Sequence, residues 1–255
     1  MKSLHKALDV LDALAAFPKG EAGVSELARQ TGIDKAIVHR VLQTLASRDV
    51  VAQDAASRRY RLGTRLVDWT GLRLAGDRPI ELARPHLMQL WNRCGETVHF
   101  TVPQGDQVMV VQVLESVQPI RVSGRLGERV PMHCTASGKL FLALGSDELR
   151  ERVLSQPLAR ITEHTIVRRK ALQQELETIR RSGVAYDSEE CVPHANAVAA
   201  PVLDASGQCR AGVALIGPSP RFTGKVLADA GRMLIDTARE ISALVAHLEP
   251  AQWRF

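Results

Sequence analysis

The chain has 255 residues, 45% of them hydrophobic and 24% charged, which is the composition of a globular protein with one large domain or two smaller ones. This excludes a disordered, collagen-like or low-complexity chain. No apolar run approaches the roughly 20 residues that cross a bilayer, and Asp9 and Asp12 interrupt any secretory hydrophobic segment. We therefore expect a cytoplasmic protein with no membrane partner.

The basic excess is small and lies near the N-terminus. Lys and Arg number 33 against 28 Asp and Glu, a net charge of +5, and residues 1–75 carry 12 of the basic and 8 of the acidic side chains. A surface that attracts an acidic partner would therefore be N-terminal. The four cysteines, at positions 94, 134, 191 and 209, form no C-x-x-C pair, which predicts reduced thiols.

Three short amphipathic helices are predicted within the first fifty residues. The first spans 4–15, with Ser3 as N-cap, and ends at residues 17–20. The second spans 25–30 with Ser25 as N-cap, and a tight turn follows at 31–33. Asp34 caps the third, which runs to about Arg48 and has an inner face of Ile37, Val38, Val41, Leu42 and Leu45.

This layout is typical of a helix-turn-helix. Ala28 is small where two helices would cross, and Gly32 can supply the positive φ of the turn. Two short strands follow at 50–52 and 59–62, around a polar hairpin tip at 54–58. The combination favours a DNA-binding winged helix over a purely structural three-helix unit.

In a winged helix the third helix would enter the major groove with its N-terminal half. Lys35 and Arg40 could reach phosphates or guanine acceptors, while Ile37 is better explained as a core residue than as a contact with a thymine methyl. Ser25 suits either a phosphate or a plain N-cap, and the hairpin arginines either a wing contact or solvated charge. The candidate DNA-binding residues are Ser25, Lys35, Ala36, Ile37, His39, Arg40, Arg58 and Arg59.

The pattern changes after a connecting helix at 66–74 and a polar break at 76–79, where we place the domain boundary. Helices are predicted at 80–94, 137–143, 170–181 and 224–248, and strands at 97–102, 107–114, 120–123, 184–187, 195–203 and 209–216. This order predicts an α+β domain with helices against an antiparallel sheet.

Six motifs in chain order resemble the IclR family of bacterial transcriptional regulators. They are T-G-x-x-K-x-x-V-H-R at 31–40, Y-R-L-G at 60–63, G-E-T-V-H at 95–99, R-V-P-M-H at 129–133, A-S-G-K at 136–139 and A-A-P-V at 199–202. The resemblance implies a winged helix over 1–64, a linker helix over 65–78 and a GAF-like effector-binding domain over 79–255. It also implies a homodimer or homotetramer on operator DNA near metabolic genes. We expect no enzymatic activity, catalytic residue, cofactor or metal.

The resemblance also implies a pocket for a small-molecule effector. Amides at a helix start and the hydroxyls of Thr135 and Ser137 suit a carboxylate, although capping explains them equally well. Asp187 suits ligand hydroxyls or, somewhat better, a turn cap. Alanines and an isoleucine stand where some relatives have polar side chains, which favours a larger organic acid, for example an aromatic one. The candidate residues are Cys134, Thr135, Ala136, Ser137, Asp187, Ala195, Ala197, Ala214 and Ile216.

Three alternatives remain open at this point. His133, Cys134, Cys191 and His194 could hold zinc if their loops converge, but their spacing is not diagnostic. The same residues with Asp187 could form a Cys-His-Asp hydrolase, which would leave the DNA module unexplained. Finally, the winged helix of a metabolite-sensing module could serve protein contacts. We favour a ligand-responsive regulator that represses metabolic genes.

Overall fold

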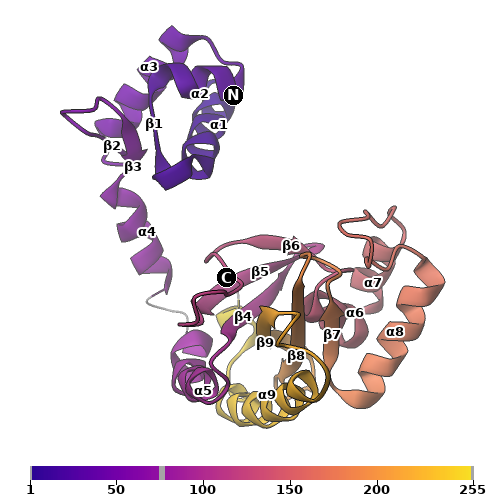
Figure 1. Ribbon diagram of the computed structural model, residues 1–255. Helices are drawn as coiled ribbons and strands as arrows, with labels where there is room; N and C mark the ends of the chain where they lie inside the picture. The colour runs from indigo at the N-terminus through magenta and orange to yellow at the C-terminus, as the bar shows by residue number, and fades with distance from the viewer. Residues whose placement is uncertain (1, 75–77, 254–255) are drawn as a thin grey trace. The chain divides into compact units, whose positions relative to one another are not determined.

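The computed structural model describes residues 2–74 and 78–253 (Figure 1). The chain forms two compact units, residues 1–76 and 77–255, each with its own hydrophobic core. Together they confirm the predicted α+β class with an N-terminal winged helix-turn-helix. Within the described ranges, no helix combines the length and the apolar character that a membrane crossing requires.

The N-terminal unit is a three-helix bundle with a small sheet. Its antiparallel strands lie in the order β1-β3-β2, and the hairpin β2–β3 forms the wing. The elements are α1 (Lys2–Ala16), η1 (Pro18–Gly20), β1 (Glu21–Ala22), α2 (Val24–Thr31), α3 (Lys35–Ala46), β2 (Val51–Gln53), β3 (Tyr60–Leu62) and α4 (Thr64–Leu74).

Local chemistry explains most of the helix boundaries in this unit. The Asp34 carboxylate accepts hydrogen bonds from the Ala36 and Ile37 amides at 2.9 and 3.3 Å, so the predicted N-cap of α3 is confirmed. Gly32 ends α2 with φ +68°. The predicted cap at Ser3 is wrong, because α1 already begins at Lys2 and Ser3 lies inside the helix. The two-residue strand β1 was not predicted, since it is too short to show a period.

The predicted linker helix corresponds to α4, which begins two residues earlier than the predicted start at Leu66. Of the predicted linker span 65–78, residues 75–77 lie outside the described part of the chain.

The C-terminal unit is built on a six-stranded antiparallel sheet in the order β6-β5-β4-β9-β8-β7. Its elements are α5 (Arg78–Cys94), β4 (Thr97–Gln104), β5 (Gln107–Leu114), β6 (Arg129–Pro131), α6 (Ala136–Leu144), α7 (Asp147–Leu154), α8 (Arg169–Ser182), β7 (Ala185–Ser188), β8 (Ala195–Leu203), β9 (Cys209–Pro218), α9 (Gly224–Val245) and η2 (Pro250–Trp253).

One predicted strand in this unit is wrong. Residues 120–123 form an irregular connection, and the outer strand beside β5 is β6. In the irregular connection the Val122 carbonyl accepts a hydrogen bond from a side chain, the Thr97 hydroxyl, at 2.7 Å. A strand carbonyl would instead accept from a backbone amide of the neighbouring strand. The short helix α7 was also missed, and its N-cap Ser146 accepts a hydrogen bond from the Leu149 amide at 3.2 Å.

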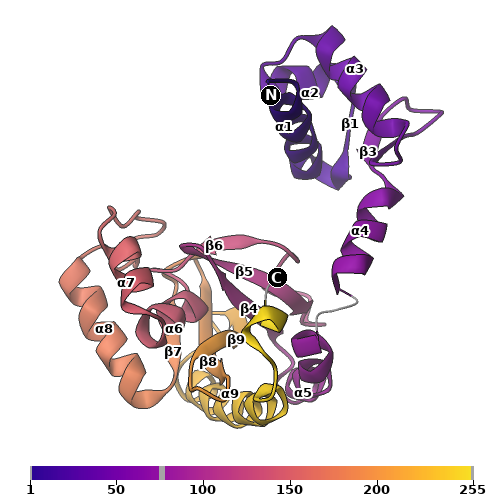
Figure 2. The ribbon, with the colours of Figure 1, turned by 180° about the vertical axis from the view of Figure 1, so that it is seen from behind.

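The sheet has two differently covered faces. Val98, Phe100 and Val102 of β4 belong to a core cluster with residues of α5 and α9, which cover one face (Figures 1 and 2). Since side chains alternate along a strand, His99 and Thr101 lie on the opposite face, the face of α6 and α8. This second face carries the site described below.

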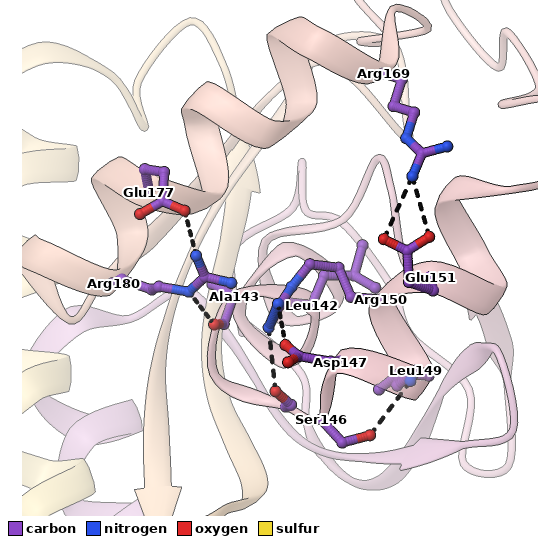
Figure 3. Close-up of polar contacts among 11 residues, drawn as sticks. Leu142, Ala143, Ser146, Asp147, Leu149, Arg150, Glu151, Arg169, Glu177 and Arg180 are labelled. Atoms are coloured by element: carbon purple, nitrogen blue, oxygen red, sulfur yellow. Dashed lines mark hydrogen bonds and ion pairs between the residues drawn. The ribbon is translucent and has the colours of Figure 1, made fainter.

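Helix α6 is held at its C-terminal end by arginines from the two following helices (Figure 3). Arg150 Nε of α7 donates to the Leu142 carbonyl at 3.1 Å, and Arg180 Nε of α8 donates to the Ala143 carbonyl at 2.7 Å. An ion pair between Arg169 and Glu151, at 3.1 Å, links α8 to α7. Because α6 has no basic residue in its own last turn, these guanidinium groups satisfy carbonyls that the helix leaves open.

Candidate DNA interface and effector cavity

The exposed face of α3 carries most of the candidate DNA-binding residues. Val38 and Leu42 are buried in the core, whereas Lys35, Ala36, His39 and Arg40 are exposed. Ile37 is only half-buried and lies outside the core cluster, so the preferred interpretation of it as a core residue is wrong. Its side chain borders a shallow groove between α1 and α3, which Arg40 also lines.

A second shallow depression brings together side chains from α2, α3 and the wing. Its lining includes five candidate residues, which are Ser25, Lys35, His39, Arg58 and Arg59. Such convergence of cationic and hydroxyl groups from separate elements is the arrangement that a phosphate backbone requires.

Ser25 is not the N-cap of α2, contrary to the prediction. The helix begins at Val24 with Gly23 as N-cap, and the Glu26 carboxylate accepts a hydrogen bond from the Gly23 amide at 2.7 Å. This bond holds the pKa of Glu26 below its usual range. Ser25 is therefore an exposed residue in the first turn of the helix, close to its positive end.

The two wing arginines differ in their surroundings. Arg59 forms an ion pair with Glu26 at 2.9 Å and donates to the Glu21 carbonyl at 2.9 Å, so part of its hydrogen-bonding capacity is engaged within the unit. Arg58 is exposed at the hairpin tip with φ +58°. Its backbone amide donates to the Asp54 carbonyl at 2.9 Å, and the Asp54 carboxylate in turn accepts from the Ser57 amide at 2.7 Å.

In the C-terminal unit a cavity lies against the second face of the sheet. Its volume is about 120 Å³, and it opens to the surface. Eight of the nine candidate effector residues line it, namely Thr135, Ala136, Ser137, Asp187, Ala195, Ala197, Ala214 and Ile216. The exception is Cys134, which is fully buried behind the wall and does not line the cavity.

Several cavity residues were not predicted. His99 and Thr101 come from β4, and Val122, Ser123 and Glu128 come from the connection between β5 and β6. Cys191 comes from the connection between β7 and β8, and Asn196 comes from β8. The alternation along β4 could have indicated His99 and Thr101, since polar side chains alternate there with a phenylalanine. No local pattern indicates the irregular connection, because only tertiary contacts place it there.

Hydrogen bonds within the unit engage several polar cavity groups. The Thr135 hydroxyl donates to the Pro131 carbonyl at 2.8 Å and accepts from the Gly138 amide at 3.2 Å, so Thr135 is the N-cap of α6. The Thr101 hydroxyl donates to the Gly212 carbonyl at 3.1 Å, and the Asn196 side-chain amide donates to the Phe222 carbonyl at 2.9 Å.

Two buried titratable groups face the cavity. Burial raises the pKa of Asp187 to about 7, although its carboxylate caps the following turn by accepting from the Glu190 amide at 2.7 Å. Asp187 thus caps the turn, which was the favoured of its two predicted roles, and it also lines the cavity, while its contact with ligand hydroxyls stays a prediction. Burial lowers the pKa of His99 to about 4, so its imidazole is neutral at pH 7.

A buried ion pair stands behind the Asp187 side of the cavity. Lys139 of α6 is 1% exposed, and its ammonium group contacts the Glu190 carboxylate, with Glu175 of α8 at 3.7 Å. The Thr165 hydroxyl donates to the Glu190 carbonyl at 2.8 Å. Periodicity did not predict this pair, because Lys139 occupies a helix that is buried all round.

The structure does not bring the four proposed zinc ligands into one cluster. His133 Nε2 is hydrogen-bonded to the Ala159 carbonyl at 2.8 Å, and His194 is exposed. Among residues 2–74 and 78–253, no three His, Cys, Asp or Glu side chains are arranged to hold a metal ion. Contact with the Cys191 thiol and burial both raise the pKa of Cys134, which disfavours the thiolate that a hydrolase nucleophile needs.

Two family models match this chain, and together they span most of its length. Residues 78–243 match the domain described as bacterial transcriptional regulator IclR C-terminal, and residues 3–55 match the IclR helix-turn-helix domain. The HTH-type transcriptional repressor AllR of Escherichia coli (strain UTI89 / UPEC) is 29% identical, over 90% of this chain and 86% of that protein.

Solved structures share the fold. The crystal structure of the Thermotoga maritima IclR covers 97% of this chain and 100% of its own, with a TM-score of 0.82 and 30% identity. An IclR homologue from Microbacterium hydrocarbonoxydans, solved in complex with 4-hydroxybenzoate, has a TM-score of 0.81 and 22% identity, over 94% of this chain and 98% of its own.

Proposed function

The chain belongs to the IclR family of bacterial transcriptional regulators, and on this premise we propose that it is a repressor of metabolic genes that responds to a small organic acid. As a family member it is a DNA-binding transcriptional regulator. The single observation that carries the proposal is the convergence of exposed Lys35, His39 and Arg58 around one depression of the winged helix. The name of the similar repressor AllR supports the direction of regulation.

For the DNA interface we propose that α3 enters the major groove. Lys35, Ala36, His39 and Arg40 would face base edges or nearby phosphates, and Ile37 would border the contact through its half-exposed methyl groups. Ser25, in the exposed first turn of α2, and Arg58, at the wing tip, suit phosphates. Arg59 would contribute mainly by shaping the wing, since Glu26 already pairs with it.

We propose the division into a winged helix over 1–64, a linker helix over 65–78 and an effector-binding domain over 79–255. The protein would bind palindromic operators as a homodimer or homotetramer, because a two-fold operator requires two winged helices about one helical turn or a multiple of it apart. A bacterial regulator of this kind would act in the cytoplasm, where the chromosome is, and would need neither a cofactor nor enzymatic activity.

For the effector we propose an organic acid with an apolar body, for which an aromatic acid is a good candidate. Ala195, Ala197, Ala214 and Ile216 form an apolar wall of the cavity. The start of α6 supplies amides that suit a carboxylate. A similar fold has been solved with 4-hydroxybenzoate, which makes that compound a suitable probe.

The test is an electrophoretic mobility shift with the upstream region of the protein's own gene. We expect Arg40→Ala to weaken binding about 5- to 150-fold, because an arginine contact to a base or phosphate contributes about 1–3 kcal/mol. Arg48→Ala is the matched control, since Arg48 is also an exposed arginine of this unit but follows the C-terminal end of α3. Unaltered binding by the Arg40 variant would contradict the assignment of α3, and no shift with any variant would favour a winged helix that contacts protein.

A further inference from the structure

The charge of the effector cavity does not match an ionised acid. Among the residues that the structure describes, its lining contains two carboxyl groups, Asp187 and Glu128, and no lysine or arginine. Glu128 lies at the exposed mouth, whereas Asp187 is only 5% exposed and belongs to the interior. An organic anion in this cavity would therefore stand near a buried carboxylate without a cation to balance either charge, which costs free energy in a medium of low dielectric constant.

Nearby cations do not remove this mismatch. The charge of Lys139 acts on Asp187, but Lys139 contacts Glu190 and lies 3.7 Å from Glu175, so carboxylates already balance its charge. The other groups that face Asp187 are Glu190 and the Cys134 and Cys191 thiols, none of which is cationic.

The amides at the start of α6 can donate to a carboxylate but carry no full positive charge, and several polar side chains of the cavity are engaged within the unit. The Thr101, Thr135 and Asn196 side chains donate to backbone carbonyls of the same unit. Within the described residues, His99 Nε2 has no hydrogen-bond partner although its side chain is nine-tenths buried in the cavity wall. It lies close to Gly124, where a Cβ atom would come within 2.0 Å of it. A neutral imidazole of this kind can exchange one hydrogen bond with a ligand but supplies no charge.

We propose that the cavity binds its organic acid together with one proton, which is shared between the Asp187 side chain and the carboxyl group of the effector. The inference rests on the proposed function, because it assumes that the effector is an acid. No covalent bond changes. The proton comes from solvent, and the bound pair is one carboxylic acid hydrogen-bonded to one carboxylate, with a single net negative charge.

The two candidate carriers of the proton differ in how easily they are protonated before binding. With a pKa of about 7, Asp187 holds a proton in about half of the molecules at pH 7, whereas His99, at about 4, holds one in about one molecule in a thousand. Protonation of Asp187 therefore demands far less of the binding free energy. Asp187 Oδ1 accepts the turn bond from the Glu190 amide, and the Asp187 side chain lines the cavity.

The experiment is isothermal titration calorimetry of the full-length protein with benzoate and 4-hydroxybenzoate at pH 6, 7 and 8. We expect the affinity to be about tenfold lower at pH 8 than at pH 6, with nearly one proton taken up per acid at pH 8, measured from the enthalpy in buffers of different ionisation heat. Asp187→Asn should bind these acids with little pH dependence, because its amide can donate a hydrogen bond at every pH. His99→Gln should keep the tenfold dependence.

The outcomes separate this inference from the proposed function. Binding of either acid with equal affinity at pH 6 and 8 would overturn proton sharing and leave the acid effector standing. Loss of the pH dependence in His99→Gln, with retention in Asp187→Asn, would assign the proton to His99 and also overturn the proposal. Failure of both acids to bind at millimolar concentration and pH 6 would contradict the proposed effector class, and the inference with it.

Discussion

His99 illustrates how one residue connects sequence position, burial and pH. It follows Val98 and precedes Phe100, which face the core on the other side of the sheet, so the imidazole is directed to the cavity face and buried there. Burial favours its neutral form and lowers its pKa to about 4, against an ordinary value of 6.5. Between about pH 4 and pH 6.5, His99 is therefore mostly neutral in the folded protein and mostly protonated in the unfolded chain.

This gives a prediction for stability. Between pH 6.5 and pH 4 the unfolded state binds a proton that the folded state does not, so His99 makes the protein less stable as the pH falls. Asp187 acts in the opposite sense: its folded pKa is raised to about 7, so the stability that it costs grows as the pH rises from about 4 to 7. In the wild-type protein the two contributions to the pH dependence of stability oppose each other, so a substitution is needed to measure one of them alone.

We expect His99→Gln to gain about 2 kcal/mol relative to wild type when the pH is lowered from 7.5 to 5. Urea unfolding followed by circular dichroism at the two pH values measures this difference. A gap between variant and wild type that is the same at both pH values would show that His99 titrates normally in the folded state.

At the scale of elements, α6 links the cavity to the rest of the C-terminal unit. Its N-terminal end forms the cavity wall at Thr135–Ser137, and Gly138 lies so close to Met132 that a Cβ atom would come within 2.3 Å of the Met132 Cα. Its C-terminal carbonyls are bonded by Arg150 and Arg180 (Figure 3). Between these ends, Lys139 joins the helix to the segment that follows β7, through Glu190.

The buried pair predicts an asymmetric response to substitution. Lys139→Met leaves the Glu190 carboxylate buried without its cation, which costs roughly 3–5 kcal/mol of the free energy of unfolding at neutral pH. The double variant Lys139→Met/Glu190→Leu removes both charges and should recover most of that loss. Denaturant titration of both variants tests this, and a double variant that is no more stable than the single one would contradict it.

At the scale of the whole molecule, the two units divide the work of a regulator. The N-terminal unit carries the exposed cations of the candidate DNA interface, and the C-terminal unit holds the cavity. A ligand can change DNA binding only if it favours one arrangement of the protein over another, so the effector must bind the two states with different affinity. The helix α4 follows the wing in sequence, and we propose that it transmits the effect of ligand binding to the winged helix.

The salt dependence of operator binding reflects the phosphate contacts that the winged helices of two protomers make together. If Lys35, Arg40 and Arg58 of each of two protomers neutralise phosphates, the operator affinity should fall about a thousandfold between 50 and 200 mM salt. Fluorescence anisotropy with a labelled operator measures the slope. Arg40→Ala should reduce the steepness of the slope, and a slope near zero in the wild type would exclude a phosphate-dominated interface.

Local sequence patterns predict the winged helix and the α+β class, and the family resemblance predicted eight of the nineteen residues that line the cavity. These features depend on local periods, caps and motifs, such as the Asp34 N-cap and the A-S-G-K motif at 136–139, which act over a few residues. The sequence also suggested Ser25 as a cap and residues 120–123 as a strand. The cap prediction fails because α2 begins one residue earlier, with Gly23 as N-cap, and the strand prediction fails because residues 120–123 form an irregular connection in which the Thr97 hydroxyl donates to the Val122 carbonyl.

The electrostatics of the cavity depend on tertiary packing, which the sequence pattern does not show. The approach of Glu190 to Lys139, and of residues 122–128 to His99 and Asp187, joins segments that are distant in the chain. Burial raises the pKa of Asp187 and lowers the pKa of His99, and burial is a property of the packed fold. Residue types show which groups can titrate, and their three-dimensional surroundings fix the pH at which they do.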